Sequence, residues 1–175
     1  MRQLRESPGD FYMNELNQDA EECRTMFAHL MGCDQDEVAL VENTSVGCNI
    51  AFDLIELPIA GNVVFDQYSY PSSVLPWFLP ARAHIEKKFV RPREDGILYL
   101  EDFKKSIDSD TVAVCISHVT QEQGFRNDLA SLAEVAHDNG AVIIVDGAQS
   151  AGAMSIDLHK IEVDFFSTTA MKWLL

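Results

Sequence analysis

Paired cysteines are absent from this sequence. The four cysteines are widely spaced and include no C-x-x-C pair: Cys23, Cys33, Cys48 and Cys115. In a chain of 175 residues, this spacing argues against a disulfide framework and against a zinc site. Free thiols are typical of a reducing compartment, so we expect buried or half-exposed cysteines in a cytoplasmic protein.

Long apolar runs are absent too. No run approaches the ~18 residues that a membrane-spanning helix needs. The N-terminal MRQLRESPGDF lacks the apolar centre of a signal peptide. We therefore expect neither membrane association nor secretion.

Basic residues are scarce. The 13 lysines and arginines are outnumbered by 28 aspartates and glutamates, which gives a formal net charge of −15. Such a charge repels nucleic-acid phosphates and anionic membrane surfaces, so neither is an expected partner. The glycine-rich phosphate motifs G-x-G-x-x-G and G-x-x-x-x-G-K-[ST] are also missing, which disfavours a generic nucleotide-binding domain.

The sequence does contain enough apolar residues for a core, 47% of the chain, arranged in short runs. Apolar runs bounded by turn residues predict strands at 37–42, 62–66, 84–90, 111–117, 141–145 and 163–166. Helical spacing and cap residues predict helices at 13–31, 46–57, 100–107 and 129–139. Because strands and helices alternate, we expect an α/β fold: a mostly parallel sheet with helices on both faces and right-handed crossovers.

The most informative stretch is 141–175, which reads AVIIVDGAQSAGAMSIDLHKIEVDFFSTTAMKWLL. Its first apolar run suits a strand that is buried on both faces, and the run ends on Asp146. Carboxyl ends of strands hold ligands in open α/β sheets, so we expect this carboxylate to meet a cationic partner. The second run leads through hydroxyl residues to Lys172, whose neighbours W-L-L predict apolar surroundings that favour a neutral amine.

A second candidate site lies where the strand at 37–42 is expected to give way to a helix. Asn43, Thr44 and Ser45 stand at this point. The free N–H groups of a first helical turn bind anions. A plain helix cap is the alternative that the three residues alone leave open.

The pattern D-G-A-Q-S-A-G, followed by V-D-F-F, hydroxyl residues and K-W-L, resembles the class V pyridoxal-phosphate (PLP) aminotransferase family, which includes cysteine desulfurases and isopenicillin-N-epimerase-like proteins. The resemblance implies the PLP-dependent transferase fold of type I. It also implies that Asp146 pairs with the pyridine nitrogen, that Gln149 lies near the phenolic oxygen of the ring, and that Lys172 forms the Schiff base.

The resemblance extends to other segments. N-T-S-V-G-C-N-I resembles the family's phosphate loop, which implies that Thr44 and Ser45 bind the PLP phosphate; Thr169 matches a further phosphate contact. The P-W pair in QYSYPSSVLPWF implies that Tyr70 stacks on the ring, although an ordinary loop tyrosine is nearly as compatible with these residues. The stretch HVTQEQG implies that Gln121 lies near the phenolic oxygen.

The chain departs from cysteine desulfurases at several positions. Met171 replaces the histidine before the lysine and cannot donate a hydrogen bond to phosphate, which favours the epimerase-like branch. Tyr70 replaces the stacking histidine, and Gln121 replaces an asparagine. His118 is expected to be a structural residue at a strand end, with acid–base catalysis as the alternative.

The resemblance covers nearly the whole chain. Full-length family members continue with a small C-terminal domain, which carries an arginine for the substrate carboxylate, and they build the site between subunits. We therefore expect residues 1–175 to be a partial PLP-binding large domain that lacks the small C-terminal domain, and to form a homodimer when complete.

Two functions are consistent with the sequence. The first is a PLP-dependent enzyme of the class V aminotransferase type that acts on a small amino acid through Lys172. Transamination, desulfuration, epimerisation and elimination all stay open. The alternative is a truncated, non-catalytic protein of the same fold with a binding or structural role.

Overall fold

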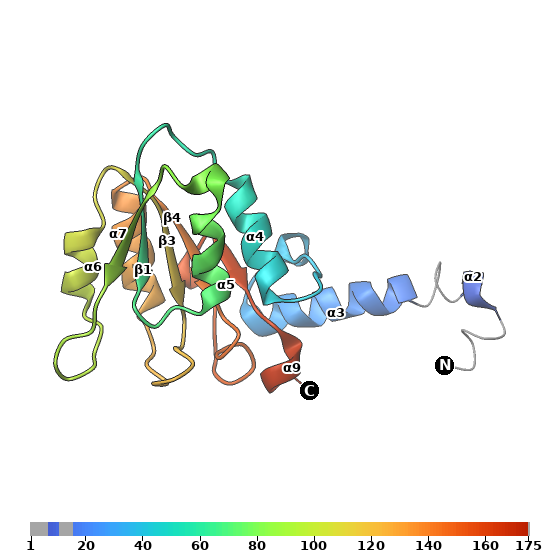
Figure 1. The fold of residues 1–175 in the computed structure, drawn as a ribbon. Helices are drawn as coiled ribbons and strands as arrows, with labels where there is room; N and C mark the ends of the chain where they lie inside the picture. The colour runs from blue at the N-terminus through green and yellow to red at the C-terminus, as the bar shows by residue number, and fades with distance from the viewer. Residues whose placement is uncertain (1–6, 11–15, 175) are drawn as a thin grey trace. The chain divides into compact units, whose positions relative to one another are not determined.

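The five strands of the computed structural model form one sheet in the order β2-β1-β3-β4-β5 (Figure 1). Their bounds are β1 Asn62–Asp66, β2 Glu86–Val90, β3 Thr111–Ser117, β4 Val142–Asp146 and β5 Phe165–Ser167. Every neighbouring pair runs parallel, so the predicted parallel sheet is confirmed. The order changes direction between β1 and β3, and the crevice beyond the strands at such a switch point is the usual ligand position.

The structure describes residues 7–10 and 16–174, which divide into two units. The larger unit, Val41–Met154 with Lys160–Leu175, contains the sheet. The smaller unit, Met1–Leu40 with Ser155–His159, contains α2 (Pro8–Asp10), α3 (Leu16–Met31) and η2 (Gln35–Glu37). The start of the helix predicted from residue 13 lies outside the described residues, whereas its predicted end at Met31 is confirmed.

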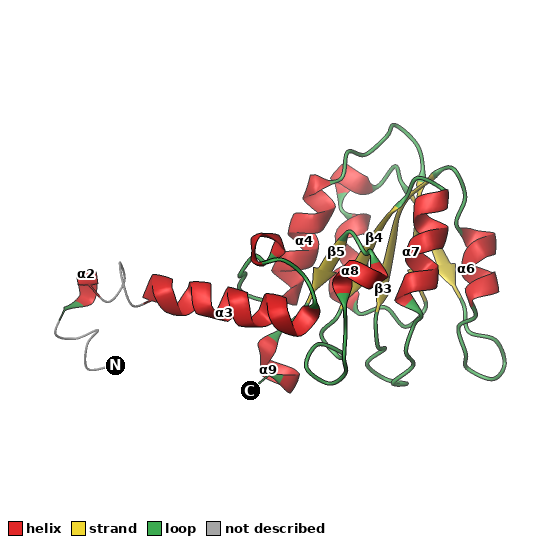
Figure 2. Cartoon of the chain, turned by 180° about the vertical axis from the view of Figure 1, so that it is seen from behind, coloured by secondary structure: helices red, strands yellow, loops and turns green. Residues whose placement is uncertain are grey.

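Helices cover both faces of the sheet (Figures 1 and 2). On one face, α6 (Leu100–Ser106) and α7 (Leu129–Asp138) pack on strand residues such as Val64 and Ile143. On the other face, α4 (Thr44–Leu54) packs on the neighbouring strand residues, such as Val63 and Ile144. Because successive strand residues point to opposite faces, a strand covered on both sides is apolar throughout. The predicted fold class is therefore confirmed.

The chain between β1 and β2 packs on the same face of the sheet as α4. It consists of the short helices α5 (Pro71–Val74), η3 (Leu75–Phe78) and η4 (Pro80–Arg82). Trp77 anchors it, because its fully buried ring lies 5.4 Å from the ring of Phe52 and 6.5 Å from that of Phe65. Two further short helices flank β5: α8 (Leu158–Ile161) and α9 (Ala170–Trp173).

The predicted strand at 37–42 does not form. Glu37 instead closes a capping box around η2, in which its Oε2 accepts the Asp34 N–H at 2.7 Å. The apolar residues that follow, Leu40 and Val41, are 56% and 39% exposed, and neither pairs with a strand within the described residues. A local turn that satisfies its own backbone groups is therefore preferred over the β pattern.

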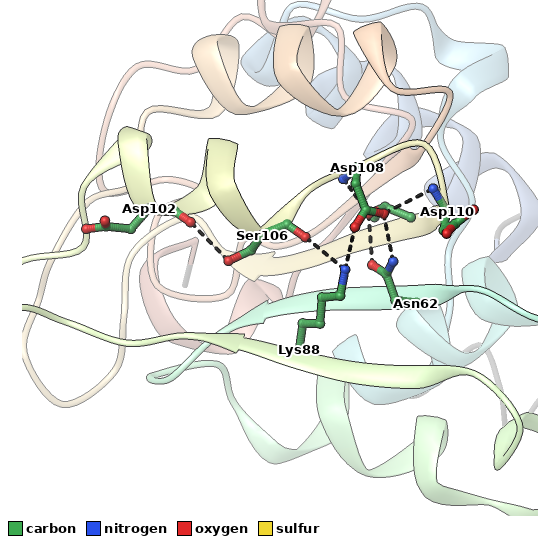
Figure 3. Close-up of polar contacts among 7 residues, drawn as sticks. Asn62, Lys88, Asp102, Ser106, Asp108 and Asp110 are labelled. Carbon is green, nitrogen blue, oxygen red and sulfur yellow. Dashed lines mark hydrogen bonds and ion pairs between the residues drawn. The ribbon is translucent and has the colours of Figure 1, made fainter.

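A polar cluster ties the amino ends of the strands together (Figure 3). The Asp108 carboxylate accepts hydrogen bonds from Lys88 Nζ at 2.6 Å and from Asn62 Nδ2 at 2.9 Å. Thr111 Oγ1 donates to Asn62 Oδ1 at 2.8 Å. The cluster thus joins β2 to the first residues of β1 and β3, at the end of the sheet remote from the strands' carboxyl ends.

The cysteines form no disulfide bond with one another. All four cysteines are free: Cys23 is exposed, Cys33 is partly buried, and Cys48 and Cys115 are buried. Within the described part of the chain, no helix combines the length and the apolar character needed to cross a membrane.

Candidate functional site

A pocket lies beyond the carboxyl ends of β1, β3 and β4, at the point where the strand order changes direction. All eight residues predicted for a cofactor site line it: Thr44, Ser45, Tyr70, Gln121, Asp146, Gln149, Thr169 and Lys172. These residues belong to segments that are far apart in the sequence, and the fold brings them together. Their individual roles stay predictions.

The amino end of α4 forms one wall of the pocket. Asn43 caps the helix, because its Oδ1 accepts the Val46 N–H at 3.0 Å. Thr44 and Ser45 occupy the first turn, where backbone N–H groups have no partner within the helix. This turn, with the positive end of the helix dipole behind it, can bind an anion such as phosphate.

A close approach between α4 and β5 positions this turn. Ser167 Oγ donates to Thr44 O at 2.9 Å, although the two residues are 123 positions apart. A Cβ atom on Gly47 would lie 2.3 Å from Ser167 Oγ, so the side chain is accommodated because residue 47 is glycine. The contact places the first turn of α4 next to the segment that carries Thr169 and Lys172.

Asp146 occupies the floor of the pocket at the end of β4. Its side chain is buried, and Oδ1 accepts the Ala148 N–H at 3.0 Å. Burial raises the pKa of this carboxyl, while the Ala148 N–H and the positive charge of Lys172 act in the opposite direction. A buried carboxylate of this kind is stabilised by a cationic group placed against its free oxygen.

Gly147 allows the Asp146 turn to approach β5. Its N–H donates to Ser167 O at 2.7 Å, and a Cβ atom at this position would lie only 2.0 Å from the ring of Phe166. Thr168 Oγ1 also donates to Gly147 O, at 3.1 Å. The sequence showed Gly147 only as part of a motif. The structure gives a steric reason for glycine at this position, because a larger side chain would collide with Phe166.

Lys172 lies in α9, and its predicted apolar surroundings do not form. The side chain of Lys172 is exposed, and those of Met171 and Trp173 are 72% and 54% exposed. Leu175 lies outside the described residues. The prediction was wrong because neighbours in sequence point in different directions on a helix and do not surround one another.

Tyr70 and Gln121 line the pocket from the loops after β1 and β3. Tyr70 precedes Pro71, the first residue of α5, and is 46% exposed. Gln121 is exposed and lies in a tight turn that Thr120 closes, with Thr120 N–H donating to Phe125 O at 2.9 Å. Both side chains are thus free to meet a ligand, and neither has a hydrogen bond to another described residue.

His118 lies next to the site without lining the pocket. Its Nδ1 is 2.9 Å from Ser150 Oγ, which donates onward to Gly147 O at 3.1 Å. Because the Ser150 hydroxyl donates its proton to Gly147 O, it must accept a hydrogen bond from the imidazole. We therefore place the proton of the neutral imidazole on Nδ1. Burial, followed by the charge of Arg126, lowers the pKa of the imidazole to about 4, which keeps it neutral. These contacts fit the predicted structural role.

The pocket contains residues that the sequence did not single out as ligands, among them Ser72 and Ser117. Ser117 ends β3 as Asp146 ends β4, so its position at a strand end was a usable signal. Ser72 Oγ is buried and has no hydrogen-bond partner among the described residues. An orphan hydroxyl in the wall of a pocket is expected to gain a partner when a polar ligand binds.

The pocket lining combines three kinds of group that can bind a polar ligand. Backbone N–H groups and hydroxyls converge at the Thr44 turn, Asp146 offers a carboxylate on the floor, and Lys172 supplies a primary amine.

The aminotransferase class-V family model matches residues 9–175. The chain is 31% identical over 170 residues to a cysteine desulfurase of Haloferax volcanii, covering 91% of this chain and 40% of the relative. It is 31% identical over 162 residues to the uncharacterized aminotransferase YcbU of Bacillus subtilis, covering 92% and 43%. The chain therefore spans about two fifths of the length of these relatives.

Solved structures have the same fold. An apo cysteine desulfurase from Thermococcus onnurineus superposes with a TM-score of 0.78 at 29% identity, covering 86% of this chain and 38% of that chain. The cystine C-S lyase C-DES, in complex with its product cysteine persulfide, gives 0.86 at 22% identity, covering 97% and 47%. At that identity the likeness concerns the fold alone. Another structure of C-DES contains glycine covalently linked to its PLP cofactor.

Proposed function

The chain belongs to the class-V aminotransferase family, and from this premise we propose that it binds pyridoxal 5'-phosphate in the pocket and that the whole protein acts on a small amino acid. When bound, PLP supplies an electron-withdrawing ring that stabilises negative charge at the α carbon of an amino acid. One observation carries the proposal: the eight residues matched to the family's cofactor site, which are dispersed in the sequence, line a single pocket.

The α4 turn is the proposed phosphate site. The N–H groups and hydroxyls of Thr44 and Ser45 would bind the phosphate oxygens, with Thr169 adding a hydroxyl from the β5 side. The helix dipole favours the anion. Met171 has no hydrogen-bond donor, so this site relies on hydroxyl and backbone donors.

Asp146 is the proposed partner of the ring nitrogen. Its buried carboxylate would hold a proton on that nitrogen, because the charged pair relieves the desolvation of the carboxylate. Gln149 and Gln121 offer side-chain amides for the phenolic oxygen, and the ring of Tyr70 offers an apolar face for stacking. Together these groups would fix the orientation of the ring.

Lys172 is the proposed covalent attachment point and general base. Its Nζ would hold the cofactor until an amino acid displaces it, and the released amine could then take a proton from the α carbon of the substrate. Lys172 lines the same pocket as Asp146 and the Thr44 turn, which both tasks require.

Loading the protein with PLP tests the cofactor proposal directly. We expect a visible absorption band that borohydride reduction converts to a stable adduct, and peptide mapping should locate that adduct on Lys172. Lys172→Ala should lose the adduct. Lys105→Ala is the control, because Lys105 lies on α6 with its side chain 73% exposed and does not line the pocket.

Two results would overturn the assignment. An adduct that persists in Lys172→Ala would assign the attachment to another lysine. A wild-type protein that has a native circular dichroism spectrum but gains no band would refute the cofactor proposal itself.

Binding without turnover is the second candidate. The exposure of Met171 and Lys172 favours it, because a general base works best where water is excluded. We would add L-cysteine and L-alanine separately to the PLP-loaded protein and measure sulfide, pyruvate and the spectrum. Release of product at catalytic turnover would reject this candidate.

A cytoplasmic location and a homodimer belong to the same proposal. Four free cysteines support a reducing compartment. The exposed side chains of Met171 and Trp173 support association with a second copy. Sedimentation at several concentrations tests the dimer, and a monomer throughout would refute it.

A further inference from the structure

Asp66 is a buried carboxylate that the proposed chemistry does not use. It ends β1, the strand on one side of the switch point, and its relative exposure is 0%. A buried carboxyl group of this kind normally has either a cationic partner or a specific set of hydrogen-bond donors. No lysine, arginine or histidine in the described part of the chain forms an ion pair with Asp66.

The donors around Asp66 come from the two segments that enter the pocket. Oδ1 accepts the Tyr68 N–H at 2.8 Å, and Oδ2 accepts the Ser69 hydroxyl at 3.0 Å. From the neighbouring strand, the Ser117 N–H lies 3.4 Å from Oδ2. The carboxyl group therefore holds its own downstream turn against the end of β3.

This turn delivers Tyr70 to the pocket. Ser69 N–H donates to Asp66 O at 3.2 Å, and the next residue, Tyr70, lines the pocket immediately before α5. Ser117, on the other side of the carboxyl group, also lines the pocket. Tyr70 itself is 46% exposed, so little besides its backbone restrains the position of its ring.

We propose that Asp66 is a positioning residue for the cofactor site: its buried carboxyl group holds the 66–69 turn against β3 so that Tyr70 presents its ring to the cofactor. The inference rests on the proposed PLP site and goes beyond it, because Asp66 does not line the pocket. Its effect on the cofactor is transmitted through Tyr70.

A double-mutant cycle on cofactor binding tests this role. The dissociation constant for PLP is measured by titration for the wild type, Asp66→Asn, Tyr70→Ala and the double variant, together with the circular dichroism of the bound cofactor. Loss of an aromatic stacking partner is expected to raise the Kd of Tyr70→Ala about tenfold. Asp66→Asn should raise it several-fold, because the amide retains the volume but alters the turn.

The decisive comparison is the effect of Asp66→Asn in the Tyr70→Ala background. If Asp66 acts through Tyr70, the second substitution changes the Kd little there, and the visible circular dichroism of the two single variants is altered in the same sense. An equal effect in both backgrounds, or no effect in either, overturns the inference. Asp95→Asn is the matched control, because Asp95 caps an exposed turn, accepting the Ile97 N–H at 2.9 Å, away from the pocket.

A second variant covers the case in which Asp66→Asn does not fold. Ser69→Ala removes one donor to the carboxyl group and leaves the carboxyl group in place. Ser69→Ala should raise the Kd for PLP less than Asp66→Asn does, and it should change the Kd little in the Tyr70→Ala background. An equal effect of Ser69→Ala in both backgrounds refutes the positioning role of Asp66. A wild type that binds no PLP would refute the proposed function instead, so the two failures are distinguishable.

Discussion

Two buried side chains at the carboxyl ends of the strands have opposite pH dependence. Burial raises the pKa of Asp66 from its ordinary value of 3.8 to about 6. Burial lowers the pKa of His118 from its ordinary value of 6.5 to about 4. The folded protein therefore retains a proton on Asp66, and excludes one from His118, over nearly the same pH range.

The sign of each contribution follows from proton linkage. For Asp66 the folded state binds the proton more tightly, so its contribution to stability is complete below pH 3.8 and is lost as the pH rises through about 6. For His118 the contribution is complete above pH 6.5 and is lost as the pH falls through about 4. Each shift corresponds to roughly 3 kcal/mol of unfolding free energy, so the two nearly cancel.

A variant that lacks one of the two groups should lose the pH dependence that this group contributes to the unfolding free energy. We predict that the unfolding free energy of Asp66→Asn, relative to the wild type, rises by about 3 kcal/mol between pH 4 and pH 6.5, and that His118→Asn shows the reverse slope. Urea unfolding across this pH range measures both. Parallel pH profiles for wild type and variants would contradict the prediction, whatever the absolute loss of stability.

At the residue scale, the sequence indicated Asp146 and missed Asp66. Both end a buried apolar strand, but only Asp146 is itself part of a motif with a family counterpart, whereas the motif after Asp66 begins at Gln67. The pattern of a carboxylate directly after an apolar run was visible for Asp66, so position alone could have drawn attention to it. The exposure of Lys172 could not be predicted in this way, because it depends on how α9 is placed.

At the element scale, the Asp108 cluster is expected to hold the amino ends of β1, β2 and β3 together. Lys88 and Asn62 donate to the Asp108 carboxylate and lower its pKa to about 2. Its contribution to stability is therefore complete above the ordinary value of 3.8 and is lost as the pH falls toward 2. Asn62 is buried, so removal of the carboxylate leaves a polar group with one partner fewer.

We predict that Asp108→Ala lowers the unfolding free energy by about 1–3 kcal/mol at neutral pH. Asp110→Ala is the matched control, since Asp110 is exposed and takes part only through its backbone: its N–H lies 3.0 Å from Asp108 Oδ1, and its carbonyl accepts the Asn62 N–H at 2.9 Å. Urea unfolding of both variants measures the difference. Equal losses would mean that the cluster of Figure 3 is not a stabilising element.

The elements themselves were largely predictable, and the exception has a physical reason. The strands 62–66 and 111–117 were predicted with their observed bounds, because apolar runs covered on both faces leave a continuous signal. The segment 37–42 has a similar apolar run, VALV, but it pairs with no neighbouring strand in the described part of the chain. A strand requires a partner, and short-range sequence patterns carry no information about partners.

At the scale of the whole molecule, the net charge of −15 opposes the approach of an anionic cofactor. The favourable groups, the α4 turn and Lys172, act only at short range. We predict that the association rate constant of PLP rises with NaCl concentration, because salt screens the long-range repulsion. Stopped-flow absorption at low and high salt measures it, with sucrose at matched viscosity as the control. A rate that falls with salt would show that local positive charge dominates the approach.

The pocket is built from residues between Asn43 and Lys172, on segments that parallel strand pairing and contacts such as Ser167 Oγ to Thr44 O bring together. Contacts of such long sequence separation form late in folding, because every crossover must be complete before the strand ends meet. A folding intermediate with part of the sheet would have no complete pocket. A ligand that binds only the complete pocket should therefore lower the unfolding rate constant and leave the folding rate constant unchanged.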